Sequence, residues 1–334
     1  MTWRLLAFAL MFQLASGFAA LLSPLAGAAD LPEKTVHMGF VFPGEAAANP
    51  GMKQEVFWAR LRTLGWEEGR NLKVERRYTR DDMEAFPGFM AEMVQQNVDI
   101  IMTTTTRGAL AAKKATDKIP IVVHYMNDPV AAGLVSSFAH PGGNLTGMTT
   151  QFGEGIAAKS LELLQDAIPK LSNVAILSNA NNPGIRRVED LVANAARARS
   201  IKSTVLRLQA ASEIDRSVQR ARQLAQAVIV LADPLFIEHH DRVVTEVNRV
   251  SLPAIYGYRL FVVAGGLMSY GPNPAEAWGQ SAVYIDKILR GANAGELPIV
   301  QPTQFLFAVN LKTAKALGLT FPESILLRAD EVIR

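Results

Sequence analysis

The stretch Ile100-Ile101-Met102-Thr103-Thr104-Thr105-Thr106-Arg107-Gly108 joins an apolar segment to four threonines and then to an alanine-rich segment. We expect a buried strand over residues 98–102 and a helix over residues 109–115. The change from apolar to polar lies where a parallel strand should end, and open α/β sheets bind ligands at that edge. A helix N-terminus there offers free backbone N–H groups and the positive end of a dipole, which suit a carboxylate or a phosphate. Alternatively, the threonines only end the strand and cap the helix.

Strands and helices alternate along the chain on both sides of this stretch. In the first half we expect strands over residues 36–42, 72–78, 98–102 and 119–123, and further helices over residues 52–64 and 82–96. In the second half we expect strands over residues 174–177, 203–208, 228–231 and 254–256, and helices over residues 184–200, 213–226 and 235–250. Such alternation predicts an α/β fold with two doubly wound lobes, each a parallel sheet with helices on both faces.

Three connectors rich in glycine or proline separate the predicted lobes. They cover residues 141–148, 265–273 and 297–302. The second connector precedes an expected helix over residues 274–290, and the third leads to an expected strand over residues 305–309. Three crossings between lobes would leave the lobes hinged. We assign residues 30–148 and 272–302 to lobe 1, and residues 149–271 and 303–334 to lobe 2.

The first 29 residues have the layout of a secretory signal. A short positive start with Arg4 precedes an apolar run over residues 5–22, and Ala26-Gly27-Ala28-Ala29 supplies small residues for cleavage. An uncleaved membrane anchor is the alternative, since the apolar run nearly reaches spanning length. The chain has no Cys, which excludes a disulfide scaffold, a thiol nucleophile and a lipidated cysteine. These features predict a periplasmic protein with a cleaved signal and no lipid anchor.

Composition and motifs exclude several other classes. The formal net charge is only +3, and the Lys and Arg residues are scattered, so nothing demands a nucleic acid partner. The run His239-His240-Asp241 is a poor metal site, because neighbours on a helix point about 100° apart. The chain has no GxGxxG fingerprint, no GxSxG elbow and no ordered catalytic set. We therefore expect no cofactor, no metal and no enzymatic activity.

Several motifs resemble those of the ABC transporter substrate-binding protein family. They are Asp128-Pro129-Val130, Pro141-Gly142-Gly143-Asn144-Leu145-Thr146-Gly147, Ala232-Asp233-Pro234-Leu235, Gly265-Gly266-Leu267-Met268-Ser269-Tyr270-Gly271 and Asn310-Leu311-Lys312-Thr313-Ala314-Lys315. The resemblance covers nearly all of the chain after the signal. It implies a type I periplasmic-binding-protein (Venus-flytrap) fold, in which two Rossmann-like lobes joined by three crossover strands hold a solute.

Two segments depart from the family pattern. The run over residues 277–282 lacks the basic residues usual there, and His124-Tyr125-Met126-Asn127 is bulkier than the small-residue run expected before Asp128. The second departure lies at a strand end, so it bears on the identity of the ligand more than on the fold.

The resemblance implies a periplasmic receptor that captures a small solute, an amino acid or similar small carboxylate, and delivers it to the permease and ATPase subunits of an importer. We expect it to act as a monomer. One alternative is a sensory protein that presents the solute to a signalling receptor, and another is an enzyme on the same frame. A repressor of the lactose type is excluded, because an export signal stands where a DNA-reading helix-turn-helix would lie.

The candidate ligand contacts are the residues that follow strands in both lobes, together with residues of the connectors. They are Phe42, Thr104, Thr105, Thr106, Asn127 and Asp128 in the first lobe, Asn179, Asp233 and Tyr258 in the second, and Thr150 and Tyr270 in the connectors. The aromatic members could hold an apolar or aromatic group between their rings. Of two neighbouring tyrosines, Tyr258 is assigned to the ligand and Tyr256 to the core.

The polar candidates divide by the charge that they would bind. Thr105 and Thr106, with their backbone N–H groups, would hold a carboxylate, and Asp233 would contact an ammonium group. Asp233 could equally cap the helix that follows it, since Asp is a preferred residue at that position. Asp128 has the same two possible roles.

Overall fold

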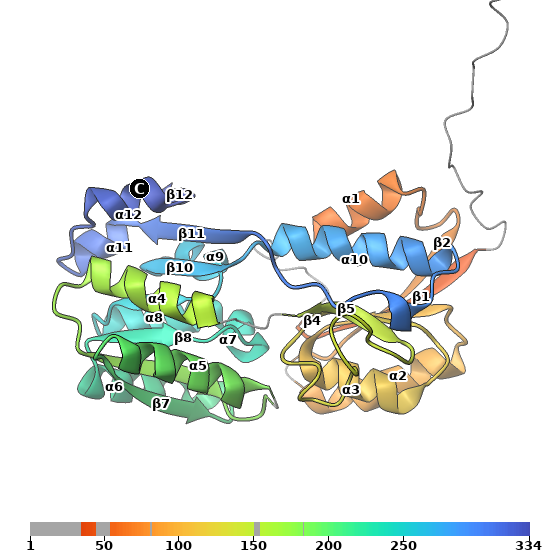
Figure 1. Cartoon of the computed structure of the whole chain (residues 1–334), viewed down its shortest axis with the longest axis horizontal. Helices are drawn as coiled ribbons and strands as arrows, with labels where there is room; N and C mark the ends of the chain where they lie inside the picture. Colours follow the sequence, from red (N-terminus) through yellow and green to blue (C-terminus); the bar gives the residue numbers. More distant parts are fainter. Residues whose placement is uncertain (1–34, 45–53, 81, 150–153, 183) are drawn as a thin grey trace, which may run out of the picture. The chain divides into compact units, whose positions relative to one another are not determined.

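The computed structural model describes residues 35–44, 54–80, 82–149, 154–182 and 184–334, which form two β-sheets with helices packed around them (Figure 1). The predicted signal over residues 1–29 and the candidate ligand residue Thr150 lie outside the described residues. In the described ranges, no helix is both long enough and apolar enough to cross a membrane.

Among the described residues, the first sheet contains five strands, and all of its strand pairs are parallel. In spatial order they are β2 (Leu72–Tyr78), β1 (Val36–Phe42), β3 (Ile100–Thr103), β4 (Ile121–Met126) and β5 (Leu145–Thr149). Two helix pairs cover its faces: α2 (Phe86–Gln95) with α3 (Thr105–Ala115), and α1 (Glu55–Thr63) with α10 (Pro274–Leu289). Because β2 and β3 lie on opposite sides of β1, the chain changes direction there, and such a point borders a ligand crevice.

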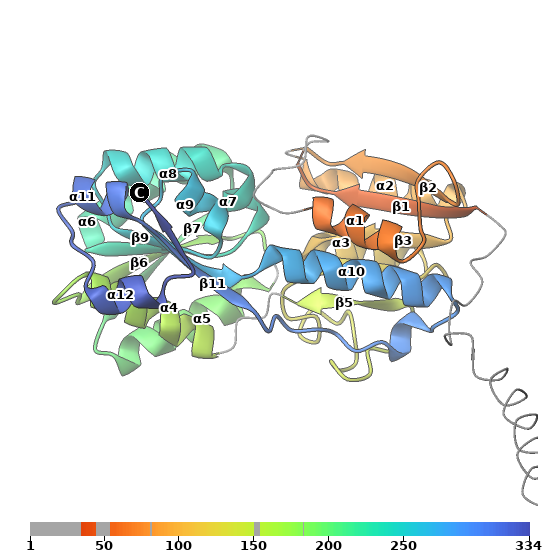
Figure 2. The same cartoon turned by 90° about the horizontal axis from the view of Figure 1, so that it is seen from above.

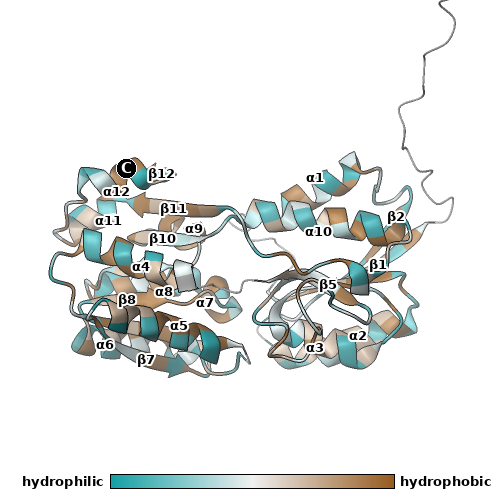
Figure 3. Ribbon diagram, viewed as in Figure 1, coloured by the Kyte–Doolittle hydropathy of each residue, from teal (hydrophilic) through white to brown (hydrophobic). Residues whose placement is uncertain are grey.

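The second sheet is also mostly parallel, and only its β10–β11 pair is antiparallel among the described strands. In spatial order its strands are β12 (Glu331–Ile333), β11 (Phe305–Asn310), β10 (Met268–Pro272), β9 (Ala254–Tyr256), β8 (Ala227–Val230), β6 (Asn173–Asn179) and β7 (Lys202–Leu208). Strands β8 and β11 are strongly apolar, as Figure 3 shows, because helices bury both faces of the sheet.

Two apolar clusters lie on opposite faces of the second sheet. One contains side chains from α4 (Glu154–Ala167), α5 (Ile185–Ala198), α11 (Leu311–Ala316) and α12 (Glu323–Arg328). The other contains side chains from α6 (Ile214–Leu224), α7 (Pro234–Glu238), α8 (His240–Arg249) and α9 (Arg259–Val263). Three short 3-10 turns complete the described elements: η2 (Met83–Ala85), η3 (Ala211–Glu213) and η4 (Ala294–Glu296). This arrangement confirms the predicted α/β fold with two sheet-based lobes.

Helix α10 belongs to the first lobe although its flanking strands, β10 and β11, belong to the second sheet. It lies beside α1 (Figure 2), and it also contacts β4 and β5. The Trp66 indole N–H donates to Asp286 Oδ1 of α10 at 2.9 Å, which ties this late helix to an early loop. The chain therefore crosses between the sheets before and after α10.

Some elements differ in extent from the sequence prediction. Helix α3 begins at Thr105 rather than at residue 109, and β4 continues to Met126 rather than ending at residue 123. The helix expected over residues 235–250 consists of α7 and α8, which are separated at His239 by a non-helical backbone. That segment contains no Gly and no internal Pro after residue 234, so the sequence carries none of the usual signals for such a break.

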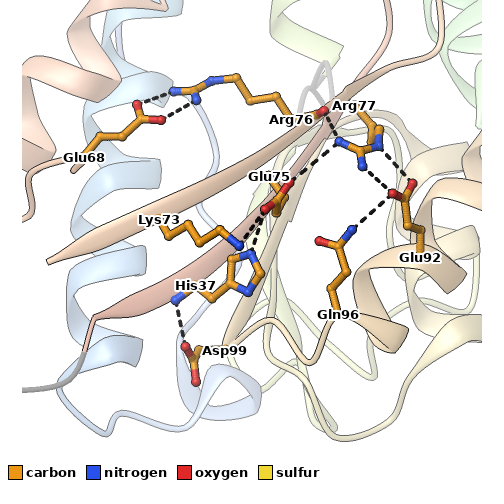
Figure 4. A network of polar contacts seen from close by, with 9 residues as sticks. All are labelled: His37, Glu68, Lys73, Glu75, Arg76, Arg77, Glu92, Gln96 and Asp99. Carbon is orange, nitrogen blue, oxygen red and sulfur yellow. Dashed lines mark hydrogen bonds and ion pairs between the residues drawn. The ribbon is translucent and has the colours of Figure 1, made fainter. Parts of the chain in front are cut away.

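The outer strand β2 carries a network of charged side chains (Figure 4). Arg76 forms two hydrogen bonds of 2.6 Å with Glu68, and the Lys73 ammonium lies 2.9 Å from Glu75. Arg77 pairs with Glu92 of α2. Charged side chains on an edge strand oppose pairing with another sheet. Protection of the exposed edge of β2 therefore explains this network.

Candidate ligand-binding site

A cavity of about 940 Å³ is lined by residues that follow strands of both sheets. Its walls include eight of the candidate residues from the sequence: Phe42, Thr104, Thr105, Thr106, Asn127, Asn179, Asp233 and Tyr258. Phe42 and Asn179 are the last residues of β1 and β6, and the other six residues follow β3 and β4 in the first sheet and β8 and β9 in the second. Carboxyl ends of strands in α/β sheets are where ligands bind, so we consider this cavity the candidate site.

The threonines that end β3 use their hydroxyl groups to hold neighbouring strands. Thr103 Oγ1 donates to the Val41 carbonyl at 2.8 Å, and Thr104 Oγ1 donates to the Tyr125 carbonyl at 3.3 Å. Both side chains are buried. These hydroxyl groups thus fix the ends of β1, β3 and β4 relative to one another.

The next two threonines begin helix α3. Thr105 Oγ1 accepts the Gly108 backbone N–H at 3.0 Å, which is a helix-capping contact, and Thr106 Oγ1 accepts the Asn127 N–H at 3.0 Å. The hydroxyl groups therefore have structural partners. The backbone N–H groups of residues 105–107 have no hydrogen-bond acceptor among the described residues and remain the donors available to an anion. Thr105 has a φ of +68°, which is rare for a β-branched residue, and such strain tends to persist at ligand sites.

Asp233 supplies a buried carboxylate from the second lobe. It is 2% exposed and caps α7: its Oδ1 accepts the Leu235 backbone N–H at 2.9 Å. The Asn179 amide also donates to Oδ1 at 2.8 Å, and the Asn182 amide donates to Oδ2 at 2.6 Å. Burial raises the pKa of Asp233 above its usual value, while these three hydrogen bonds oppose that rise.

No Lys or Arg in the described part of the chain forms an ion pair with Asp233. A carboxylate has about four acceptor positions, and residues that the structure describes fill three of them. The free position is on Oδ2. A buried carboxylate without a cation is energetically costly, so a cationic group of a ligand would be favoured beside it.

The rim of the cavity carries a contact between the two lobes. Arg107 of α3 pairs with Glu84 in its own lobe, and its guanidinium also donates to the Asn181 carbonyl of the second lobe at 3.4 Å. The ion pair with Glu84 thus compensates the positive charge of Arg107, which would otherwise be unfavourable beside the N-terminus of α3.

A β-bulge in β4 shapes the wall of the cavity in the first lobe. Val123 is paired with Gly147 of β5, but Met126 is paired with Thr149, so β4 has one extra residue between these pairs. On a regular strand, His124 and Tyr125 would point to opposite faces. Here their ring centroids lie only 4.5 Å apart.

Three aromatic rings stack next to this bulge. The Trp278 ring of α10 lies 3.7 Å from the His124 ring and 5.6 Å from the Phe42 ring, measured between centroids. All three residues line the cavity. Burial lowers the pKa of His124 to about 3, so its imidazole is uncharged at neutral pH.

Sequence reasoning did not include His124, Tyr125 or Trp278 among the ligand residues. The available signal was the departure of residues 124–127 and 277–282 from the family pattern. A tryptophan on an amphipathic helix is ordinarily assigned to the core, and no sequence pattern predicts a β-bulge. The two departures therefore did not identify these three residues as candidate ligand contacts.

Two candidate residues do not reach the cavity. Asp128 Oδ1 accepts the Ala131 N–H at 3.1 Å, and its Oδ2 lies 3.2 Å from Arg187 Nε of the second lobe. Its carboxylate therefore stabilises a turn and an ion pair. Tyr270 stacks on Phe305 with centroids 5.8 Å apart and packs against the core of the second sheet, because its place on β10 turns it away from the cavity.

Groups of three or more potential metal ligands do not occur among the residues that the structure describes.

Tyr256, assigned to the core by the sequence, is 1% exposed and stacks on Phe261 with centroids 4.8 Å apart. Tyr258, assigned to the ligand, lines the cavity although it is only 4% exposed.

Comparison with known proteins agrees with this geometry. The family described as "ABC transporter substrate binding protein" matches residues 49–333. A protein of Clostridioides difficile (strain R20291) described as "Tyrosine-binding protein" is 24% identical over 259 residues, which is 78% of this chain and 74% of the relative.

Two solved structures share the fold. A conserved domain protein from Vibrio cholerae has a TM-score of 0.84 at 23% identity, and it matches over 90% of this chain and 100% of that chain. An ABC domain from Streptococcus pneumonia in complex with L-Trp has a TM-score of 0.84 at 20% identity, with the same coverage. The two lobes thus have the arrangement of type I periplasmic binding proteins.

Proposed function

The chain belongs to the ABC transporter substrate binding protein family, and from this membership and the cavity we propose that it captures an α-amino acid with an aromatic side chain. It would deliver this solute to the permease of an ABC importer. In this role it acts in the periplasm after removal of residues 1–29.

The observation that carries this proposal is the buried Asp233 carboxylate, which has a free acceptor position and no cationic partner among the described residues. The ammonium group of an amino acid would supply both the missing charge and a hydrogen bond. The opposite lobe offers complementary chemistry, since the first turn of α3 has free N–H groups for the carboxylate of the same molecule.

An aromatic side chain of the solute fits the composition of the cavity wall. Phe42, Tyr125, Tyr258 and Trp278 line it, and rings of this kind favour offset stacking or edge contacts with another ring. The relative described as a tyrosine-binding protein and the structure in complex with L-Trp concern ligands of the same class.

A solute that contacts both lobes would favour the arrangement in which they meet. Arg107 and Asn181 touch across the rim, and Arg187 lies 3.2 Å from Asp128. A ligand stabilises one arrangement only by its difference in affinity for the two, and contacts on both lobes provide that difference. The permease would then recognise the surface of this arrangement.

Isothermal titration calorimetry on the chain without residues 1–29 tests the proposal. We expect L-tyrosine to bind, while tyramine, which lacks the carboxylate, and 3-(4-hydroxyphenyl)propionate, which lacks the ammonium group, should each bind about tenfold to a hundredfold more weakly. Equal affinity for all three compounds would contradict the assigned polarity, and no binding by any aromatic amino acid would contradict the proposed solute. Uptake of labelled amino acid by cells with and without the gene separates transport from sensing.

A further inference from the structure

Two residues of the cavity wall, His124 and Tyr125, each carry a buried polar atom, Nε2 and Oη respectively, that has no hydrogen-bond partner among the described residues. Their residues are 2% and 7% exposed, and both belong to the bulge of β4. Buried polar atoms in folded proteins are nearly always satisfied by a partner, so a pair of unsatisfied ones in a ligand cavity requires an explanation.

The contacts of the other ring nitrogen define the tautomer of His124. Its Nδ1 lies 3.2 Å from Ser281 Oγ of α10, and this hydroxyl donates its only hydrogen to the Ala277 carbonyl at 2.9 Å. Ser281 Oγ can therefore only accept from the imidazole, so Nδ1 carries the proton. Because burial keeps the ring neutral by lowering the pKa of His124, Nε2 has a free lone pair and is an acceptor.

The hydroxyl group of Tyr125 complements this acceptor. Burial raises the pKa of Tyr125 well above its usual range, so the phenol keeps its proton and can both donate and accept. The two residues are adjacent, with ring centroids 4.5 Å apart, and stacking on Trp278 restrains the imidazole ring. The wall thus carries one hydrogen-bond acceptor, His124 Nε2, and one hydroxyl group that can donate or accept, Tyr125 Oη.

We propose that His124 Nε2 and Tyr125 Oη select solutes whose ring carries an O–H or N–H donor, such as a hydroxyphenyl or indole side chain, over solutes with a plain phenyl ring. The inference rests on the proposed binding of aromatic amino acids and identifies the residues that discriminate among them. A phenol donates to Nε2 and accepts from Tyr125, and an indole N–H donates to Nε2. A phenyl ring satisfies neither atom, and a site built to bind a polar group rejects the analogue that lacks it.

Calorimetry with L-tyrosine, L-tryptophan and L-phenylalanine tests the inference. We expect the wild-type chain without residues 1–29 to bind the first two about tenfold to a hundredfold more tightly than L-phenylalanine. His124→Phe should lose this preference and keep its affinity for L-phenylalanine, because the variant retains a ring that stacks on Trp278. Tyr125→Phe should lose the part of the preference that belongs to L-tyrosine.

Tyr256→Phe is the matched control, since it removes a hydroxyl group that is equally buried and unpartnered but lies outside the cavity. It should leave the preference unchanged. Equal wild-type affinity for the three amino acids would overturn the inference and leave the proposed function intact. No binding of any of them would overturn both.

A second measurement needs no variant. In the ¹⁵N spectrum of histidine-labelled protein, His124 should show a protonated Nδ1 and an unprotonated Nε2, and the Nε2 signal should move when L-tyrosine binds but not when L-phenylalanine binds. A protonated Nε2 in the free protein would overturn the inference.

Discussion

The indole ring of Trp278 and the imidazole ring of His124 stack with centroids 3.7 Å apart and planes 19° apart. This contact joins α10 to the bulge of β4 and removes the imidazole from water. A buried imidazole is more stable without charge, and the pKa of His124 is accordingly lowered to about 3.

The first prediction concerns pH and follows from this shift. The unfolded chain has a His124 pKa of about 6.5, so between that pH and about 3 the unfolded state binds more protons than the native state. Stability contributed by neutral His124 is therefore complete above this window and is lost as the pH falls through it. Relative to His124→Phe, the wild type should lose about 1.4 kcal/mol of unfolding free energy per pH unit below 6.5.

Urea unfolding of both proteins at about pH 7 and about pH 5 measures this difference. The other titrating groups are common to the two proteins, so their contributions cancel in the comparison. Parallel changes of stability with pH would show that His124 is charged in the native state or exposed to water.

The second prediction concerns the charge of Asp233. Asp233→Asn keeps a good helix-capping residue at the start of α7 but removes the negative charge. We expect affinity for L-tyrosine to fall about tenfold to a hundredfold. Stability should change little, because the removal of a buried charge offsets the loss of the hydrogen bond from the Asn182 amide.

The ligand provides the control for this variant. With 3-(4-hydroxyphenyl)propionate, which has no ammonium group, wild type and Asp233→Asn should differ little, and the difference between the two ligands isolates the ammonium contact. An equal loss of affinity for both ligands would assign Asp233 to the architecture of the cavity alone.

The third prediction concerns Thr105, whose hydroxyl caps α3 through the Gly108 N–H. Thr105→Val should lower the unfolding free energy by about 1 kcal/mol, because the cap is lost and a β-branched residue remains at positive φ. Thr105→Asn should retain stability, since Asn both caps helices and tolerates this backbone conformation. Thermal unfolding of the two variants checks this difference, and equal stability of Thr105→Val and the wild type would show that the hydroxyl group does not act as a cap.

The fourth prediction concerns the glycine opposite the bulge. A Cβ on Gly147 would lie 2.1 Å from the Val123 carbonyl oxygen, at a φ of +144°. Gly147→Ala should therefore destabilise the chain by about 3 kcal/mol or more, because the two strands must separate locally.

Gly143→Ala is the matched control for that variant. Gly143 also has a positive φ, +64°, but no atom of the described residues beyond its chain neighbours lies within 4 Å of the position of its Cβ. Its cost should be about 1 kcal/mol, from backbone conformation alone. Equal losses in urea unfolding would show that backbone conformation, and not contact with β4, fixes the glycine at position 147.

Much of the fold could be predicted because hydrophobic periodicity and turn residues act locally. The strands over residues 36–42, 72–78 and 254–256 have the predicted bounds, since each is an extended segment enclosed by polar or turn-forming residues. Eight of the candidate residues line one cavity because parallel strands bring their carboxyl ends to one edge, and their role in ligand binding stays a prediction.

The remaining part of the site depends on contacts between distant segments. The bulge in β4 is defined by its pairing with β5. Trp278 reaches the cavity wall because α10 packs on the first sheet. The hydroxyl groups of Thr104 and Thr106 also have partners on β4 or directly after it, which no local pattern discloses. Contacts between distant segments thus fix the parts of the cavity wall that local sequence patterns do not predict.

The position of α10 in the chain has a consequence for folding. During synthesis, the strands β1 to β5 emerge long before the helix that covers one face of their sheet, and β10 and β11 of the second sheet lie on either side of that helix in the chain. Contacts between such distant segments form late, because they require the closure of long loops. The first lobe cannot be completed until α10 has emerged, and the second cannot be completed until β11 and β12 have emerged, so the two lobes are not two independent units of folding.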